Sequence, residues 1–195
     1  MSRLSPRRAD AVRNAERILD AAVETIADDP AASLERIAAR AGVSRPTLYA
    51  HFASRDALMD ELTLRSSREV AARIEAARPD EGPAGEALGR VITAAWATIG
   101  RYRGLVLVNR RLPPDELRAY AAPAGALVRG LIARGQREGG FDDELSADWL
   151  LTVLVELIHA AAQQVSAGAM DASDAEAALL RTTDAVLARP RGRGR

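Results

Sequence analysis

Two short apolar stretches separated by a turn, "LERIAARAGVSRPTLYAHF" over residues 34–52, constrain this chain most strongly. Apolar residues recur at helical spacing in the first stretch, at Leu34, Ile37, Ala38 and Ala41. This spacing predicts a helix of about two turns. Ser33 stands where an N-cap is expected, and Gly42 suits the left-handed residue that ends a helix.

A second short helix is predicted to begin at Arg45. Ser44 is a good N-cap, and Pro46 falls in the first helical turn, where a missing N–H costs no hydrogen bond. Leu48 and Phe52 lie four residues apart and can pack on the preceding helix. The residues left for other faces, which we expect to meet solvent or a ligand, are Arg45, Pro46, Thr47, Tyr49 and His51.

Helices of two turns are marginal in water by themselves, so a third helix must brace them. The segment from about Asp10 to Asp28 supplies it, with one apolar face at helical spacing. The three together form a helix-turn-helix, in which the second short helix enters the major groove of DNA. Arginine suits guanine edges there, and hydroxyl and imidazole groups donate to phosphate oxygens.

Residues 33–62, "SLERIAARAGVSRPTLYAHFASRDALMDEL", resemble the DNA-binding region of the TetR family of bacterial transcriptional regulators. The resemblance implies that Ser33 and three residues of the second short helix, Thr47, Tyr49 and His51, hold phosphates. Arg55 stands where the family usually has a lysine that contacts the DNA backbone. The residues that read or approach bases are then Ser44, Arg45 and Pro46. Arg7 and Arg8, ahead of the first helix, are expected to reach the flanking minor groove or phosphates as a basic arm.

Helical patterns continue through the rest of the chain and predict an all-α fold of about nine helices. The expected ranges after the reading helix are 55–77, 85–101, 103–111, 115–138, 146–167 and 173–188. Ser54 is predicted to cap the first of these, and "SDAE" predicts a capping box with Ser173 as the N-cap of the last. The predicted domains are 1–54 for DNA binding, with 1–9 as a flexible arm, then 55–188, with 189–195 as a disordered basic tail.

The helix predicted over 146–167 is apolar nearly all round and must be buried on two sides. One side carries Leu145, Trp149, Val153, Leu157 and Ala160. The adjoining side carries Leu150, Leu151, Leu154, Ile158 and Val165. We expect one side to face its own domain and the other a second copy, so that this helix and 173–188 form a four-helix homodimer interface, as the resemblance also implies.

Polar groups along the remaining helices are candidates for binding a small organic effector. Trp96, Tyr102, Asn109 and Tyr120 lie on or near an apolar stripe, although a tryptophan on such a stripe is more often core. Glu156 and His159 lie three residues apart inside the apolar helix, where ionisable groups need a partner. Three roles stay open for these two residues. The first is structural, as a hydrogen-bonded pair or a position at the rim of the interface; the second is binding of a small molecule; the third and least favoured is a metal site.

Composition and the absence of certain motifs exclude several other classes of protein. The chain has 27 basic and 27 acidic residues, all the basic ones arginine, and no cysteine, so disulfides and thiolate metal sites are excluded. We expect no cofactor, no metal and no membrane span, and a cytoplasmic location, because no apolar segment matches a signal peptide or a bilayer span. Motifs of nucleophilic and metal-dependent enzymes are absent from the sequence, so we expect no catalytic activity.

The sequence therefore predicts a sequence-specific DNA-binding regulator. We expect a repressor that leaves a palindromic operator on double-stranded DNA when a small molecule binds. Two alternatives remain: a helical interaction module, or a DNA-binding protein without an effector.

Overall fold

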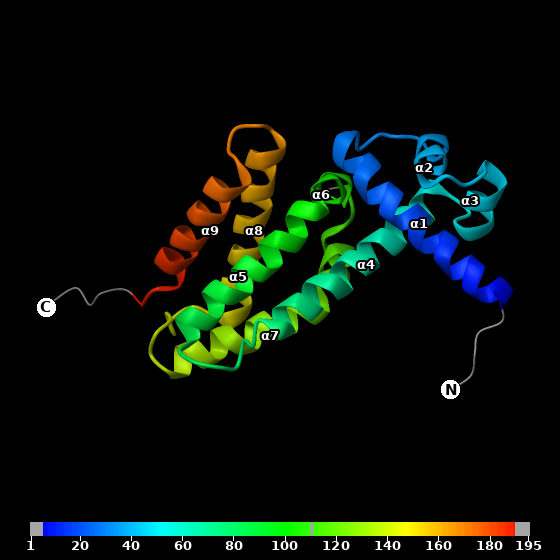
Figure 1. The fold of residues 1–195 in the computed structure, drawn as a ribbon. Coiled ribbons are helices and arrows are strands. Elements are labelled where there is room, and N and C mark those ends of the chain that lie inside the picture. The colour runs from blue at the N-terminus through cyan, green and yellow to red at the C-terminus, as the bar shows by residue number, and fades with distance from the viewer. Residues whose placement is uncertain (1–5, 110, 190–195) are drawn as a thin grey trace, which may run out of the picture. The chain divides into compact units, whose positions relative to one another are not determined.

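The computed structural model describes residues 6–109 and 111–189, and within these ranges the chain folds into nine α-helices and no strand (Figure 1). The helices are α1 (Pro6–Asp28), α2 (Leu34–Ala41), α3 (Arg45–His51), α4 (Arg55–Ala76), α5 (Ala84–Arg101), α6 (Arg103–Asn109), α7 (Pro114–Arg137), α8 (Ala147–Ser166) and α9 (Ala172–Leu187). The all-α prediction is confirmed. The helix bounds fall within a few residues of those expected, because proline, glycine and capping residues mark most of the ends.

The chain divides into two compact units. The first, called the reading unit below, contains the residues up to Arg65 together with Arg101–Arg111. The second, called the helical unit, contains Ser66–Gly100 and the residues from Leu112 onward. The reading unit is thus larger than the predicted segment 1–54, because it takes in the first half of α4 and all of α6.

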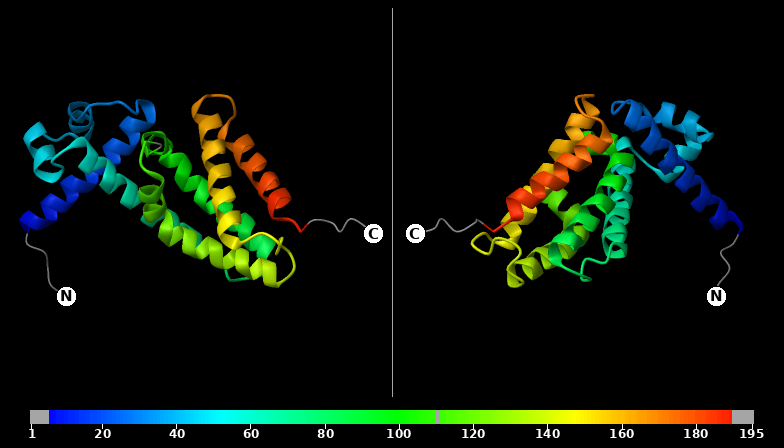
Figure 2. Two further views of the ribbon diagram at one scale, coloured as in Figure 1. Left: turned by 180° about the vertical axis from the view of Figure 1, so that it is seen from behind. Right: turned by 60° about the vertical axis from the view of Figure 1, so that its left-hand side comes forward.

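The reading unit is built around α1. Ile18, Ala22 and Ile26 recur every four residues along α1 and are at most 1% exposed, as an amphipathic helix requires. Both views place α2 and α3 beside α1 (Figure 2). The core of the unit also contains Leu34, Ile37, Leu48, Phe52, Leu58, Leu62, Tyr102 and Leu105. The expected brace is therefore present, and α6 adds to it from later in the chain.

The two short helices have the N-caps and the glycine C-cap that the sequence predicts. The Ser33 hydroxyl accepts from the Arg36 N–H at 3.3 Å, and the Ser44 hydroxyl accepts from the Thr47 N–H at 3.2 Å. Gly42 takes the left-handed conformation, with φ of +64°. These local groups satisfy backbone donors and acceptors that helices of eight and seven residues leave unpaired.

The ends of the chain differ from expectation in detail. Helix α1 begins at Pro6 rather than near Asp10, because proline at the first helical position loses no hydrogen bond. The segment 6–9 is therefore helical, and residues 1–5 and 190–195 lie outside the described residues. Arg189, placed in the disordered tail by the sequence, forms an ion pair with Asp143 at 3.3 Å.

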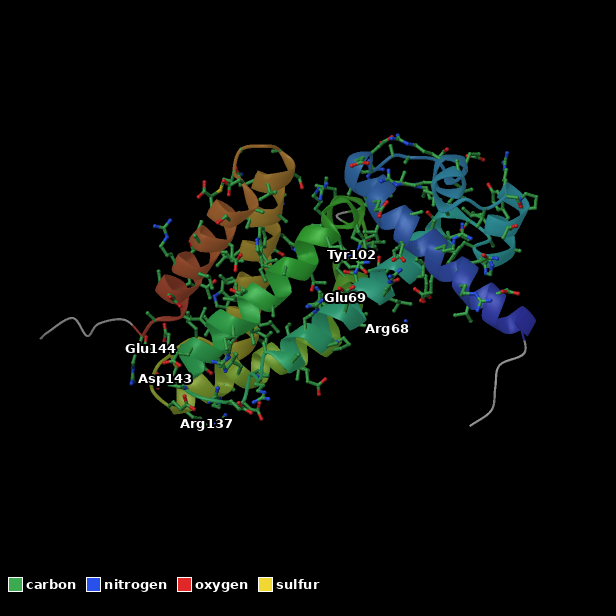
Figure 3. The ribbon with its side chains drawn as sticks, viewed as in Figure 1. Arg68, Glu69, Tyr102, Arg137, Asp143 and Glu144 are labelled. Atoms are coloured by element: carbon green, nitrogen blue, oxygen red, sulfur yellow. The ribbon has the colours of Figure 1, made fainter. Side chains whose placement is uncertain are left out.

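The helical unit ends in a pair of helices, α8 and α9, which lie side by side and run in opposite directions in both figures. Leu150, Leu154, Leu179 and Leu187 are at most 3% exposed and form part of the core. The turn from α7 into α8 is fixed by Gln136, whose side-chain amide donates to the carbonyls of Asp142 and Leu145 at 2.8 Å. Figure 3 shows the charged side chains of this end of the unit at Arg137, Asp143 and Glu144.

The predicted capping box at the start of α9 is wrong. Asp171, not Ser173, is the N-cap, and its carboxylate accepts from the Asp174 N–H at 2.7 Å. An aspartate caps at least as well as a serine and precedes it by two residues, so Ser173 lies inside the helix.

Candidate nucleic-acid interface

Helix α3 is held by two buried side chains and exposes the rest. Leu48 is fully buried and Phe52 is 7% exposed, so both anchor the helix as predicted. Exposed side chains include Ser44 at the N-cap of the helix and, within the helix, Arg45, Pro46 and Tyr49. A helix of seven residues with this pattern presents a polar surface of the size that fits a major groove.

Arg45 is held on its exposed face by two neighbours. Its Nη2 lies 3.1 Å from the Glu35 Oε1 on α2, and its guanidinium carbon lies 5.4 Å from the centre of the Tyr49 ring. A hydrogen bond with Tyr49, followed by the Glu35 charge, raises the pKa of Arg45 above its ordinary value. The guanidinium thus lies between the Glu35 carboxylate and the Tyr49 ring in this structure.

The other predicted phosphate ligands are partly used within the unit. The Thr47 hydroxyl lies 2.7 Å from the Ser44 hydroxyl, and Ser33 caps α2. The His51 ring is half-buried, with its centre 6.3 Å from that of Phe52. Each hydroxyl still has lone pairs or a proton beyond these bonds, so the placement is compatible with a phosphate contact.

Arg55 is half-buried and bridges α4 to the loop before α2. Its guanidinium donates to the carbonyl of Ala32 and, at 2.6 Å, to the carbonyl of Pro30. Five N–H groups are available on a guanidinium, so these two bonds leave donors for a phosphate. The structure thus gives Arg55 a role that the sequence did not indicate, which is to fix the loop that carries Ser33.

The six candidate ligand residues do not fall in one compact unit. Tyr102 is 2% exposed in the core of the reading unit, where Asn109 also lies and donates to the Thr63 hydroxyl at 3.1 Å. Trp96 and Tyr120 belong to the helical unit, as do Glu156 and His159. The Trp96 ring is 6% exposed and donates to the Ala172 carbonyl at 3.1 Å, so its placement is that of a core residue.

An open hollow of about 570 Å³ in the reading unit carries none of these candidates. Its lining is mostly charged, with Asp20, Glu24 and Asp28 facing Arg40, Arg101 and Arg103. Arg40 pairs with Glu24 at 2.9 Å, and Arg101 pairs with Asp20 at 3.4 Å. The hollow therefore differs from the mostly apolar cavity expected for an organic effector.

The outer side of α8 is apolar and exposed. Trp149 is 57% exposed and Leu145 just before the helix is 39% exposed, whereas Leu150 is fully buried. Only 17% of the most apolar 18-residue segment of α8 is buried. By length and composition alone, this helix could cross a membrane. Glu156 and His159 lie on this exposed helix, with 3.8 Å between His159 Nδ1 and Glu156 Oε1.

Comparisons with known proteins agree with this geometry. Residues 18–62 match the family described as bacterial regulatory proteins, tetR family. The HTH-type transcriptional repressor LfrR of Mycolicibacterium smegmatis is 29% identical over 180 residues, which cover 92% of this chain and 93% of LfrR. The crystal structure of LfrR from Mycobacterium smegmatis in complex with proflavine matches with a TM-score of 0.72 and 27% identity, covering 88% of this chain and 94% of that one. Residues 18–62 therefore match the DNA-binding region of the TetR family, and the chain as a whole is similar to TetR-family regulators.

A further solved structure supports the fold. The fatty acid degradation regulator FadR from Bacillus halodurans matches over 100% of both chains with a TM-score of 0.74 and 18% identity. The matched region and these relatives indicate a helix-turn-helix DNA-binding transcriptional regulator. The sequence-based prediction of a DNA-binding regulator similar to the TetR family is confirmed.

Two residues near the interface were missed by sequence reasoning. Glu35 pairs with Arg45 across the turn, and Arg17 on α1 donates to the Ala41 carbonyl at the end of α2 at 2.7 Å. Neither has a helical spacing to its partner, because both contacts join different helices. The one available signal was that α1, α2 and α3 must pack together, which places charged residues on their borders near one another.

Proposed function

We propose that the chain is a cytoplasmic repressor that binds a palindromic operator as a homodimer and is released by a small organic molecule. The relatives reported above are regulators, and we assign this chain no catalytic step. The observation that carries the proposal is α3, which is anchored by Leu48 and Phe52 and exposes Arg45 and Tyr49.

The residues of the interface divide into two roles. Ser44, Arg45 and Pro46 at the start of α3 are proposed to meet base edges, where an arginine can donate two hydrogen bonds to guanine. Thr47, Tyr49 and His51, with Ser33 and Arg55 beside them, are proposed to hold phosphates. Phosphate contacts fix the register of the helix on the duplex, and base contacts select the sequence.

Selection of bound duplexes from a random DNA pool tests this proposal. We expect an inverted repeat whose halves are centred about 34 Å apart or more, because two copies of α3 must enter grooves on one side of a duplex. An enriched sequence without two-fold symmetry would overturn the homodimer. Failure to enrich any sequence as salt is raised would overturn base reading, because non-specific binding weakens steeply with salt.

The outer side of α8, with α9 beside it, is proposed as the dimer surface. An exposed patch that contains Trp149, Leu145 and the half-buried Val153 and Leu157 is costly to leave in water. Two copies that join their α8 and α9 helices would bury it in a four-helix arrangement. The exposed Glu156 and His159 are then proposed to lie at the rim of this surface, where ionisable groups keep water.

The effector is proposed to bind in the helical unit near Trp96 and Tyr120. Support comes from LfrR, which was crystallised in complex with proflavine. The test is the displacement of the protein from its selected operator by a panel that includes proflavine and stearoyl-CoA, the ligand of the FadR structure from Bacillus subtilis. A compound that lowers operator affinity at least tenfold supports release, and a panel without effect, extended to unrelated apolar compounds, would overturn it.

A further inference from the structure

The reading unit carries one acidic side chain against the start of its reading helix. Glu35 lies in the first turn of α2, and its Oε1 is 3.1 Å from Arg45 Nη2 at the first position of α3. The Tyr49 ring lies on the guanidinium as well, with 5.4 Å between its centre and the guanidinium carbon. Arg45 is therefore restrained both by a carboxylate and by an aromatic face.

Glu35 itself is held in place and stays charged. Its own backbone N–H, then Ser33, then Arg45 lower the pKa of this carboxyl. A carboxylate in the first turn of a helix also interacts favourably with the helix dipole. The preceding loop, which carries Ser33, is tied to α4 by the bonds from Arg55 to the carbonyls of Pro30 and Ala32.

A negative charge beside a DNA-binding surface repels phosphates and weakens binding to every sequence. A long arginine side chain, in contrast, loses rotamer freedom when it binds a base, and a partner that restrains it beforehand reduces that loss. An acidic partner of Arg45 should therefore lower affinity for non-specific DNA and favour the sequences in which Arg45 finds its base. The two effects together raise specificity.

We propose that Glu35 is a positioning residue for base reading, because its carboxylate holds the Arg45 guanidinium in the orientation that meets one base. This inference rests on the proposed function, in which Arg45 reads a base edge. Glu35 makes no DNA contact in this account and acts through Arg45 alone.

The experiment uses the full chain and two duplexes, the selected operator and a scrambled sequence of the same composition. The quantity measured is the ratio of the two affinities for the wild type, Glu35→Gln, Glu35→Ala, Arg45→Ala and the double variant Glu35→Ala with Arg45→Ala. A selection from random DNA with Glu35→Ala then gives the preference at each base position. Circular dichroism and thermal unfolding check that each variant stays folded.

The matched control is Glu24→Gln. Glu24 on α1 also forms an exposed ion pair, at 2.9 Å to Arg40 Nε, but its partner arginine lies on α2 and not on α3. Its substitution removes the same charge from the same unit. It therefore separates a general electrostatic effect from an effect that passes through Arg45.

We expect both Glu35 variants to lower the affinity ratio by roughly three- to tenfold, mainly by tighter binding to scrambled DNA. The preference should weaken at the base position that Arg45→Ala also loses, and Glu35→Ala should have no further effect on the ratio in the Arg45→Ala background. Glu24→Gln should leave the ratio unchanged.

Three outcomes would overturn the inference. If the Glu35 variants keep the wild-type affinity ratio while Arg45→Ala lowers it, Glu35 has no positioning role, but the proposed function still stands. An equal fall in the ratio with and without Arg45 would show that Glu35 does not act through it. An Arg45→Ala protein with the full ratio would overturn the base-reading role of Arg45 and the positioning role of Glu35 together.

Discussion

The two compact units differ in how completely they bury their own apolar side chains. In the reading unit, apolar side chains of α1, α2 and α3 are buried within the unit, and charged residues at the helix borders form ion pairs. In the helical unit, α8 keeps an apolar outer side, with Trp149 more than half exposed. The first unit exposes the polar side chains of α3, whereas the second exposes an apolar surface of the kind that marks interaction sites.

This difference separates the kinds of partner that each unit takes. DNA recognition needs exposed donors on a rigid support, and the support consists of short helices that depend on caps and on Leu48 for their position. The proposed dimerisation needs apolar area, and the outer side of α8 exposes such area at Trp149. Substitutions that affect either the packing of the reading unit or the exposed apolar side of α8 test this difference between the units.

The largest effect is expected for Leu48→Ala. Leu48 is fully buried, and removal of its side chain should lower the free energy of unfolding by about 3 kcal/mol. Urea denaturation followed by circular dichroism measures the change. Tyr49→Ala is the control from the adjacent exposed position, where we expect a change within about 0.5 kcal/mol. Similar losses for the two variants would mean that α3 is not anchored through Leu48.

Trp149→Glu should break the dimer with little effect on the fold of one copy. Because large aromatic residues at the centre of an interface contribute about 2 kcal/mol or more, the dimer should dissociate at a concentration at least about thirtyfold higher. Analytical ultracentrifugation measures this constant. Thr93→Glu, which places the same charge at an exposed position of α5, is the control and should leave it unchanged.

Gly104→Ala tests how closely the reading unit is packed. A Cβ at this position of α6 would lie 2.1 Å from the Ile26 carbonyl oxygen, so the two helices must move apart. We expect a loss of about 2 kcal/mol in the free energy of unfolding. A denaturation midpoint equal to that of the wild type would show that α6 does not pack on α1 in this way.

The smallest effect, and one of opposite sign, is expected for Gly89→Ala. No atom lies within 4 Å of a Cβ added at this position inside α5. Alanine favours a helix interior over glycine, so the free energy of unfolding should rise by about 1 kcal/mol. Thermal unfolding compared with Gly104→Ala checks it, and a decrease would indicate a neighbour that the described residues do not contain.

Local sequence signals predicted most of the fold, because they are physically local. Ser33, Gly42 and Ser44 set the ends of α2 and α3 through their own backbone and hydroxyl groups, and these predictions are confirmed. The cap of α9 was misplaced because Asp171 and Ser173 both suit the role, and only the backbone conformation decides between them.

Contacts between helices could not be predicted. The bond of Arg55 to the loop before α2 spans 25 residues, and the pair of Glu35 with Arg45 joins two helices across a turn. The outward direction of Tyr49 followed from its spacing to Leu48, but the partner of Arg45 did not. The candidate ligand residues were grouped by nearness in sequence, and Tyr102 and Asn109 belong to a different unit from Trp96.

The affinity ratio between the selected operator and a scrambled duplex, measured over a range of salt for the wild type, Arg45→Ala and Tyr49→Ala, tests the account most directly. We predict that Arg45→Ala lowers the ratio roughly tenfold or more, whereas Tyr49→Ala weakens binding to both duplexes and lowers the ratio less, because the Arg45 side chain remains and loses only the contact with the Tyr49 ring. Three proteins with the same ratio and the same affinities at every salt concentration would contradict the claim that α3 reads DNA.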